Sequence, residues 1–213
     1  MNHRVLLGAV LVVTLAACER EPQEGTRLGA PDSPAVTQTP GATTAPGAAA
    51  GLGTGQEIQV QMINSQGQNI GTARLAEEGQ GVRVAVQVSN LQPGPKGLHF
   101  HETGQCDTPG FQSAGGHFAP MGRQHGFENP QGPHAGDLPN ISVGQDGRAD
   151  TTVVAQNVSL REGQQNSLLK TGGTALMIHA NADDYRTDPS GNSGDRIACG
   201  VVGQTTAATG TTR

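Results

Sequence analysis

Six of the seven histidines lie between residues 99 and 179, in a pattern that suits metal binding. His99 and His101 are two residues apart in a strand-like segment, so both side chains leave the same face and can reach one ion. His179 ends the apolar segment 174–178. The other ligand candidates follow in a loop rich in glycine and proline, which a metal would help to order: His117, His125, His134 and Asp137.

The number of these side chains leaves two arrangements open. Six histidines and Asp137 exceed the needs of one four-coordinate site and fall one short of two separate sites. They complete two tetrads if one imidazole binds a metal through each ring nitrogen. Three histidines with an aspartate suit zinc, and four imidazoles without a thiolate suit copper. A four-plus-three arrangement with water on one metal uses the same residues.

The segment expected to position these residues is 56–203, and its hydrophobic period is two. Val82, Val84, Val86 and Val88 alternate with less apolar residues, which is typical of a half-buried strand. No long helical pattern competes, so the sequence predicts an all-β sandwich or barrel of about eight antiparallel strands. The expected strands are 58–62, 70–75, 82–88, 97–101, 141–143, 149–154, 175–179 and 197–202. Two loops, about 102–139 and 183–194, are too long for hairpin turns and are expected to be functional.

Composition and charge exclude several classes of protein. The chain has 213 residues, of which 32 are glycine and 13 proline, so a coiled coil or long helical bundle is excluded. The formal net charge of −5 argues against a nucleic-acid partner, because such proteins carry a basic surface. A small anionic ligand stays compatible, since a local basic spot can act within a negative molecule.

The N-terminus predicts export and membrane attachment. An uncharged apolar segment, 5–17, follows Arg4 and suits a signal peptide. It ends in Leu15-Ala16-Ala17-Cys18, which looks like a bacterial lipobox, in which the cysteine is lipidated. An ordinary signal peptide with an incidental cysteine, or an uncleaved anchor, is the alternative. We expect a signal peptide at 1–17, a lipidated Cys18 with a flexible tether to residue 55, and a disordered tail at 204–213.

The expected location is therefore the cell envelope, in the periplasm or on the outer surface, with the lipid on Cys18 holding the protein to a membrane. Cysteine usage agrees with an oxidising compartment. If Cys18 carries lipid, Cys106 and Cys199 remain and can pair. Two unrelated free thiols are the alternative.

Four segments together resemble the copper/zinc superoxide dismutases. They are Gly97-Leu98-His99-Phe100-His101-Glu102, Gly115-Gly116-His117-Phe118, the run from His134 to Asn140, and the run from Gly191 to Gly200. They come in the family's order and span about residues 58–203. The resemblance implies a Greek-key β-sandwich or barrel. It also implies dismutation of superoxide to dioxygen and hydrogen peroxide by a redox-cycling copper, bridged through His117 to a structural zinc, with one of each metal per chain.

The resemblance also implies roles for individual residues. The copper ligands would be His99, His101, His117 and His179, and the zinc ligands His117, His125, His134 and Asp137. Asp183 would tie a zinc-ligand histidine to a copper-ligand histidine, and Cys106 would pair with Cys199. His117 would carry a proton during turnover, and Arg196 would bind and orient the superoxide anion.

Some features depart from the animal enzymes. The loop 183–194 is short, Asn181 replaces a frequent lysine, and Asp195 precedes Arg196 where a neutral residue is common. These departures would weaken positive steering or relocate it to Arg186 or Lys170. The animal dimer interface does not carry over, so a homodimer and a monomer both stay open. Two other functions are alternatives on the same fold: a non-enzymatic copper or zinc binder with the same sandwich, and an adhesion-type sandwich with a structural zinc. The complete set of copper-type histidines with Arg196 favours the enzyme.

Overall fold

The structure is a computed structural model that describes residues 57–203. The expected signal peptide, Cys18, the tether and the tail lie outside these residues. Within them, no helix combines the length and apolar character needed to cross a membrane.

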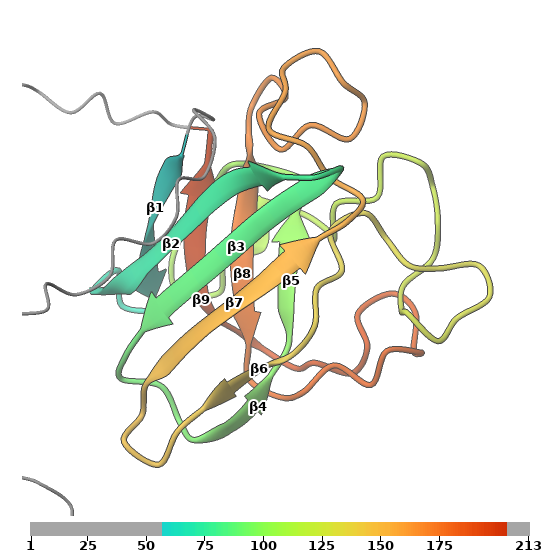
Figure 1. The fold of residues 1–213 in the computed structure, drawn as a ribbon. Helices are drawn as coiled ribbons and strands as arrows, with labels where there is room; N and C mark the ends of the chain where they lie inside the picture. The colour runs from blue at the N-terminus through green and yellow to red at the C-terminus, as the bar shows by residue number, and fades with distance from the viewer. Residues whose placement is uncertain (1–56, 204–213) are drawn as a thin grey trace, which may run out of the picture. The chain divides into compact units, whose positions relative to one another are not determined.

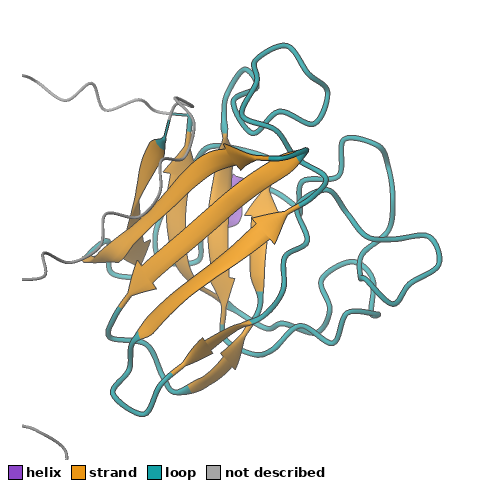
Figure 2. Ribbon diagram, in the orientation of Figure 1, coloured by secondary structure: helices purple, strands orange, loops and turns teal. Residues whose placement is uncertain are grey.

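The described residues form an all-β domain, as the sequence predicts (Figure 2). One 3₁₀ turn, Gln112–Ala114, interrupts the first long loop. The strands are β1 (Ile58–Asn64), β2 (Asn69–Glu78), β3 (Gly81–Val88), β4 (Gly94–Lys96), β5 (Leu98–His101), β6 (Ile141–Val143), β7 (Ala149–Ala155), β8 (Thr174–His179) and β9 (Arg196–Val202).

The strands form a seven-stranded sheet and a two-stranded one. The larger sheet has the order β5-β8-β9-β1-β2-β3-β7, the smaller pairs β4 with β6, and every named pair is antiparallel (Figure 1). Buried side chains from distant strands meet in one apolar cluster, including Leu75 on β2, Val84 on β3 and Phe100 on β5. The sheet therefore curls around its core, and burial of this apolar surface is its main stabilisation.

The short strand β4 was missed by the sequence, which places a strand only from residue 97. Its Gly94-Pro95 start is typical of a turn, because proline lacks the N–H that a ladder needs. Pairing with β6 overrides this preference. Lys96 at its end is buried, and its Nζ donates a hydrogen bond to the carbonyl of Ala180, at 2.9 Å.

Strands β5 and β8 are buried on both faces. On β5, Leu98 and Phe100 belong to the main core, so the alternation of side chains points His99 and His101 to the opposite face. That face is covered by the two long connections, 102–140 and 180–195. They lie on the same side of the domain, beyond β5 in Figure 1, and hydrogen bonds join them: the N–H of Glu128 donates to the carbonyl of Tyr185.

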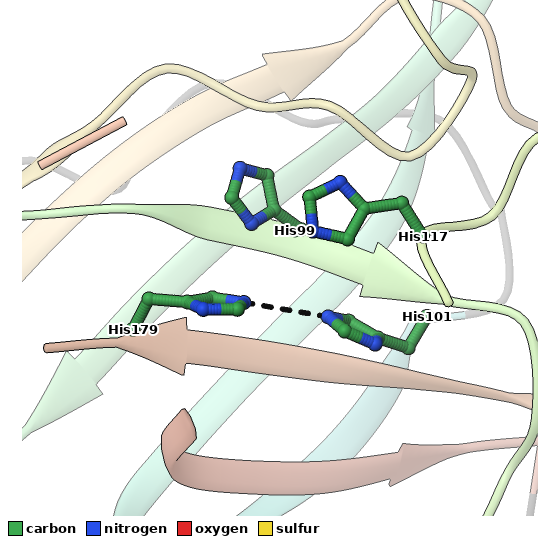
Figure 3. A group of neighbouring side chains, drawn as sticks. All are labelled: His99, His101, His117 and His179. Atoms are coloured by element: carbon green, nitrogen blue, oxygen red, sulfur yellow. Dashed lines mark hydrogen bonds between the residues drawn. The ribbon is translucent and has the colours of Figure 1, made fainter. Parts of the chain in front are cut away.

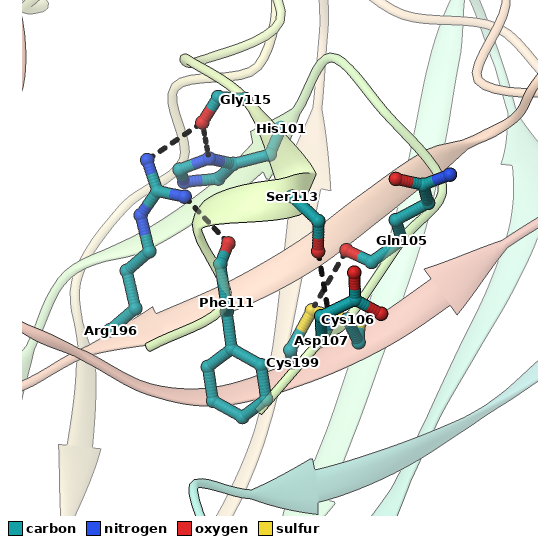
Figure 4. The surroundings of a disulfide bond; sticks show 9 residues. All are labelled: His101, Gln105, Cys106, Asp107, Phe111, Ser113, Gly115, Arg196 and Cys199. Carbon is teal, nitrogen blue, oxygen red and sulfur yellow. Dashed lines mark hydrogen bonds between the residues drawn. A yellow bond between two sulfur atoms is a disulfide. The ribbon is translucent and has the colours of Figure 1, made fainter. Parts of the chain in front are cut away.

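A disulfide between Cys106 and Cys199 joins the first long loop to β9 (Figure 4). The sequence prediction of this pair is confirmed. The two Cα atoms are 5.8 Å apart, and 93 residues separate them along the chain. A small second apolar cluster surrounds the bond, with Phe111 and Ala114 from the loop against Ala175 and Met177 of β8. The disulfide and this compact patch of buried surface thus hold the first part of the loop against β8 and β9.

We predict that replacing both cysteines, as Cys106→Ala with Cys199→Ala, destabilises the domain by about 2–5 kcal/mol, because the cross-link restricts a long loop in the unfolded chain. Denaturant unfolding of the metal-free protein measures the change. The unmodified protein in reducing buffer is the control and should lose a similar amount. Equal unfolding midpoints for the variant and the oxidised protein would contradict the prediction.

Candidate metal centre

Two segments of the first loop pair with the outer edge of β5 and bring their side chains to it. Backbone bridges join His99 to Asp137 and His101 to His117. Three hydrogen bonds of 2.8 Å close a ring of main-chain groups: Phe100 N–H to Gly136 O, Gly136 N–H to Phe118 O, and Phe118 N–H to Phe100 O. A Cβ on Gly136 would lie 2.4 Å from the Phe100 carbonyl, so only glycine allows this approach. The edge that a sheet normally leaves open is used here to place ligands.

His179 reaches the same place from β8. Met177 pairs with His99 across the two strands, and residue 179 shares the face of residue 177. The pairing of β8 with β9 slips by one residue here: Ile178 opposes Ala198, but His179 opposes Arg196. Such a bulge redirects side chains and is common beside functional sites. It places Arg196 beside His179, where a regular ladder would place Ile197.

Four histidines therefore form one compact group (Figure 3). His101 Nε2 and His179 Nε2 are 3.4 Å apart, and the ring centroids of His99 and His117 are 4.0 Å apart. One ring nitrogen from each of the four lies within 4.8 Å of the others. Four imidazole nitrogens and no thiolate form a donor set that suits copper.

A second group surrounds one oxygen of Asp137. Its Oδ1 lies 3.0 Å from His125 Nδ1 and 3.2 Å from the Nδ1 atoms of His117 and His134. Its Oδ2 accepts hydrogen bonds from the N–H groups of Gly126 and His134, which fixes the carboxylate. A zinc ion bound tetrahedrally at about 2.0–2.1 Å separates its ligand atoms by roughly 3.3 Å. The Asp137 oxygen already lies at nearly that spacing from all three histidine nitrogens.

His99 is also close to this second group, within 4.8 Å of His117, His125 and Asp137. Its Nε2, however, is engaged by Asp183 Oδ2 at 2.8 Å. His134 fits the second group better, because its Nδ1 faces the same carboxylate oxygen as the other two histidines. His117 belongs to both groups, since its Nδ1 faces Asp137 and its Nε2 faces the four-histidine group.

The nitrogens that point away from the first group have protein partners. The Nδ1 atoms of His101 and His179 lie 3.0 and 3.1 Å from the carbonyls of Gly115 and Gly194. By contrast, His99 Nδ1 and His117 Nε2 are the two buried side-chain polar atoms of the described residues without a hydrogen-bond partner. Buried polar atoms normally have partners, so this pair indicates a missing ligand. A copper ion would satisfy both.

Burial keeps most of these imidazoles neutral. It lowers the pKa of His101 to about 2, of His179 to about 3 and of His117 to about 4, and it also lowers the pKa of His99. Neutral imidazole is the form that binds a cation. His125 differs: burial opposes its charge, but hydrogen bonds to Asp137 and Asp183 outweigh this and raise its pKa to about 9. Asp137 and Asp183 are buried as well, yet hydrogen bonds from histidines hold the pKa of both carboxyls well below the usual range.

Asp183 joins the two groups, in the position that the resemblance implies. Its Oδ2 lies 2.8 Å from His99 Nε2, and its Oδ1 lies 3.0 Å from His125 Nε2. Gly191 packs directly on this contact, and a Cβ there would be 1.9 Å from Asp183 Oδ1. Its φ of +62° also favours glycine.

Arg196 lies beside His101 (Figure 4), and the two residues line one cleft with His117 and His179. Its Nη1 and Nη2 donate to the carbonyls of Phe111 and Gly115, both at 2.7 Å. Burial lowers its pKa, but a guanidinium stays charged in proteins. A cleft of about 570 Å³ is lined by His101, His117, His179, Asp195 and Arg196, among others. A small anion entering it would meet a fixed cation next to three of the four histidines.

Sequence reasoning placed each of these side chains but missed their supports. The carbonyls of Phe111 and Gly115, which hold Arg196, give no side-chain signal. Asn140 and Tyr185, which form hydrogen bonds with Asp183, were also missed. Both lie in or beside the long loops, and Tyr185 is the only tyrosine of the chain, which is the signal that could have singled it out.

Comparison with known proteins gives one consistent family. The family model "Copper/zinc superoxide dismutase (SODC)" matches residues 69–202. "Superoxide dismutase (Cu-Zn) 1" of Aquifex aeolicus is 49% identical over 150 residues, covering 69% of this chain and 89% of that protein. The superoxide dismutase-like protein YojM of Bacillus subtilis is 45% identical over 145 residues, covering 67% of this chain and 74% of that protein.

Solved structures agree. A SOD-like protein from Bacillus subtilis matches with a TM-score of 0.66 at 44% identity, covering 68% of this chain and 97% of that chain. The Cu/Zn superoxide dismutase from Brucella abortus matches with a TM-score of 0.57 at 33% identity, covering 69% and 99%. With a family model over most of the described domain and relatives at this identity, the chain belongs to the copper/zinc superoxide dismutase family.

Proposed function

We propose that the protein dismutates superoxide: two superoxide anions and two protons give one dioxygen and one hydrogen peroxide, with one copper and one zinc per chain as cofactors. The observation that carries this is the pair of buried, unpartnered nitrogens, His99 Nδ1 and His117 Nε2, beside the fixed cation Arg196. A metal-binding group, a shared imidazole and an anion site thus meet at one cleft.

The copper ligands are, in this proposal, His99 through Nδ1 and His101, His117 and His179 through Nε2. The zinc ligands are His117, His125 and His134 through Nδ1, with Asp137 through Oδ1. Hydrogen bonds support this choice of atoms: Gly115, Gly194 and Asp183 engage the opposite nitrogens of His101, His179 and His125. A ligating histidine normally donates its outer N–H to such an acceptor, which fixes the ring.

Bound copper would supply the one-electron chemistry, by accepting an electron from one superoxide and passing one to the next. Arg196 attracts the anion and orients it toward the histidines that line the cleft. His117 can hold a proton on Nε2, which faces this site, while Nδ1 stays directed at Asp137. Asp183 fixes the orientation of His99 and His125, so the two metal groups keep a fixed position relative to each other.

The alternative is a non-enzymatic copper and zinc binder on the same fold. One relative is named only "superoxide dismutase-like", a name that does not state the enzyme activity. A binder has no need of an anion site. The hydrogen bonds that fix Arg196 beside His101, together with the cleft that they share, favour the enzyme.

We further propose that the protein is exported and attached to a membrane by lipid on Cys18. The lipobox-like Leu15-Ala16-Ala17-Cys18 supports this, as does the disulfide in the folded domain, since such bonds persist in oxidising compartments. An enzyme in the envelope would meet superoxide that forms outside the cytoplasm.

Removal of each metal tests the function. The purified protein should hold about one copper and one zinc per chain by elemental analysis. We expect copper removal to abolish the protein's acceleration of superoxide decay. We expect zinc removal chiefly to lower the melting temperature, because zinc holds the loop that carries its ligands. Assays in excess EDTA, which silences free copper ions, with the metal-free protein run in parallel, are the control. No faster superoxide decay with the fully loaded protein than with the metal-free protein in EDTA would refute the enzyme.

Replacing Arg196 tests the anion site. We expect Arg196→Ala to lower the rate of superoxide decay roughly tenfold and to leave the copper content unchanged, because a nearby cation raises the encounter rate of an anion. Asp195→Asn is the matched control: it removes a negative charge from the same cleft and should raise the rate. Both effects should shrink at high ionic strength, which screens exposed charges. An unchanged rate in Arg196→Ala would remove its assigned role.

Replacing Cys18 tests the anchor. With Cys18→Ser, lipid attachment is impossible, so we expect the protein to move from the membrane fraction to the soluble fraction when cells are fractionated. The unmodified chain, processed in parallel, is the control. Continued membrane association of the variant would reject the lipid anchor and leave the dismutase proposal untouched.

A further inference from the structure

Tyr185 is bonded to the carboxylate that links the two metal groups, and neither the resemblance nor the site described above assigns it a role. Its main-chain N–H donates a hydrogen bond of 2.7 Å to Asp183 Oδ1. This is the same oxygen that lies 3.0 Å from His125 Nε2. Two donors from different parts of the chain therefore converge on one oxygen, and a shift of Tyr185 moves the oxygen that His125 uses.

The hydroxyl of Tyr185 closes a ring of contacts through Asn140. It accepts a hydrogen bond of 2.8 Å from the N–H of Asn140. The Asn140 side chain in turn holds the main chain of Asp183 twice: Nδ2 donates to the Asp183 carbonyl at 2.9 Å, and Oδ1 accepts from the Asp183 N–H at 2.8 Å. Tyr185 thus holds the carboxylate of Asp183, and Asn140 holds its backbone. The Tyr185 hydroxyl joins Tyr185 to Asn140.

Tyr185 keeps a backbone conformation that few non-glycine residues adopt. Its φ is +62°, in the left-handed region, which is strained for a side chain of this size. Two further contacts hold it there: its carbonyl accepts from the N–H of Glu128 at 2.9 Å, and its ring packs edge-on against Phe127, with centroids 5.5 Å apart. Both partners lie on the loop that carries His125, so Tyr185 joins the two functional loops.

We infer that Tyr185 is a positioning residue for the metal centre: its hydroxyl, acting through Asn140 and Asp183, fixes the orientation of His125 and His99. This rests on the proposed role of Asp183 as the link between the two groups. A residue of this kind touches neither metal nor substrate, and removing its hydrogen bond should weaken metal binding by the amount usual for outer partners of ligands, tenfold or more.

Tyr185→Phe is the direct test, because it keeps the ring and removes only the acceptor for the Asn140 N–H. We expect Zn²⁺, competed with a chromophoric chelator, to bind the full-length protein about tenfold more weakly than it binds the unmodified protein. We also expect the electron paramagnetic resonance spectrum of bound copper(II) to change, since His99 shares the carboxylate. Thr152→Val is the control. It removes an exposed hydroxyl on β7, the edge strand opposite β5, and should leave zinc affinity unchanged.

Two further variants keep the test decisive. Tyr185→Gly relieves the left-handed backbone, so this variant should fold. It also lacks the hydroxyl, so it should bind zinc more weakly than the unmodified protein. It replaces Tyr185→Phe in the test if that variant does not fold. Asp183→Asn should weaken zinc binding at least as much. Normal zinc affinity and copper spectrum in both Tyr185 variants, with weak binding in Asp183→Asn, would overturn the role of Tyr185 alone. Normal affinity in Asp183→Asn would overturn the assignment of Asp183 and this inference with it.

Discussion

The requirement that a buried imidazole satisfy both of its ring nitrogens governs this structure. Asp183 serves His99 and His125 at once, and main-chain carbonyls serve His101 and His179. Once these outer partners are fixed, the remaining nitrogens have only one direction left, which is toward the two metal groups. The four copper-type histidines are neutral because of the same burial, since desolvation disfavours the imidazolium. The same contacts therefore direct the donor set toward the two metal groups.

The supports of the site are shared, and this couples parts that are distant in the sequence. The Gly115 carbonyl accepts from Arg196 and lies next to His101 Nδ1, so one peptide group orients both the anion site and a copper-type ligand. The disulfide holds the loop that carries this carbonyl. Loss of the disulfide would thus disturb the orientation of Arg196 and His101 as well as lower the stability of the domain. Tyr185 is a similar shared support on the zinc side, where it contacts both long loops.

Local backbone irregularities do much of the positioning. The slip between β8 and β9 exchanges Ile197 for Arg196 opposite His179. Gly136 and Gly191 allow approaches that a Cβ would block, one against β5 and one against the contact of Asp183 with His125. Features of this kind cost stability in the scaffold and persist where the surrounding contacts determine them. Here those contacts are the metal-binding side chains and their partners.

The sequence by itself determined the all-β class, the strands with a two-residue period, the ligand types and the location of the functional loops. These follow from local signals: alternation of apolar residues, the spacing of His99 and His101, and glycine-rich segments too poor in apolar residues to order themselves. Through the resemblance it also named Asp183, Arg196 and the cysteine pair. Only the tertiary structure decided which nitrogen of each histidine faces inward, and that Tyr185 and Asn140 hold Asp183. These features depend on contacts between segments that are distant in the chain, and a local sequence pattern does not predict such contacts.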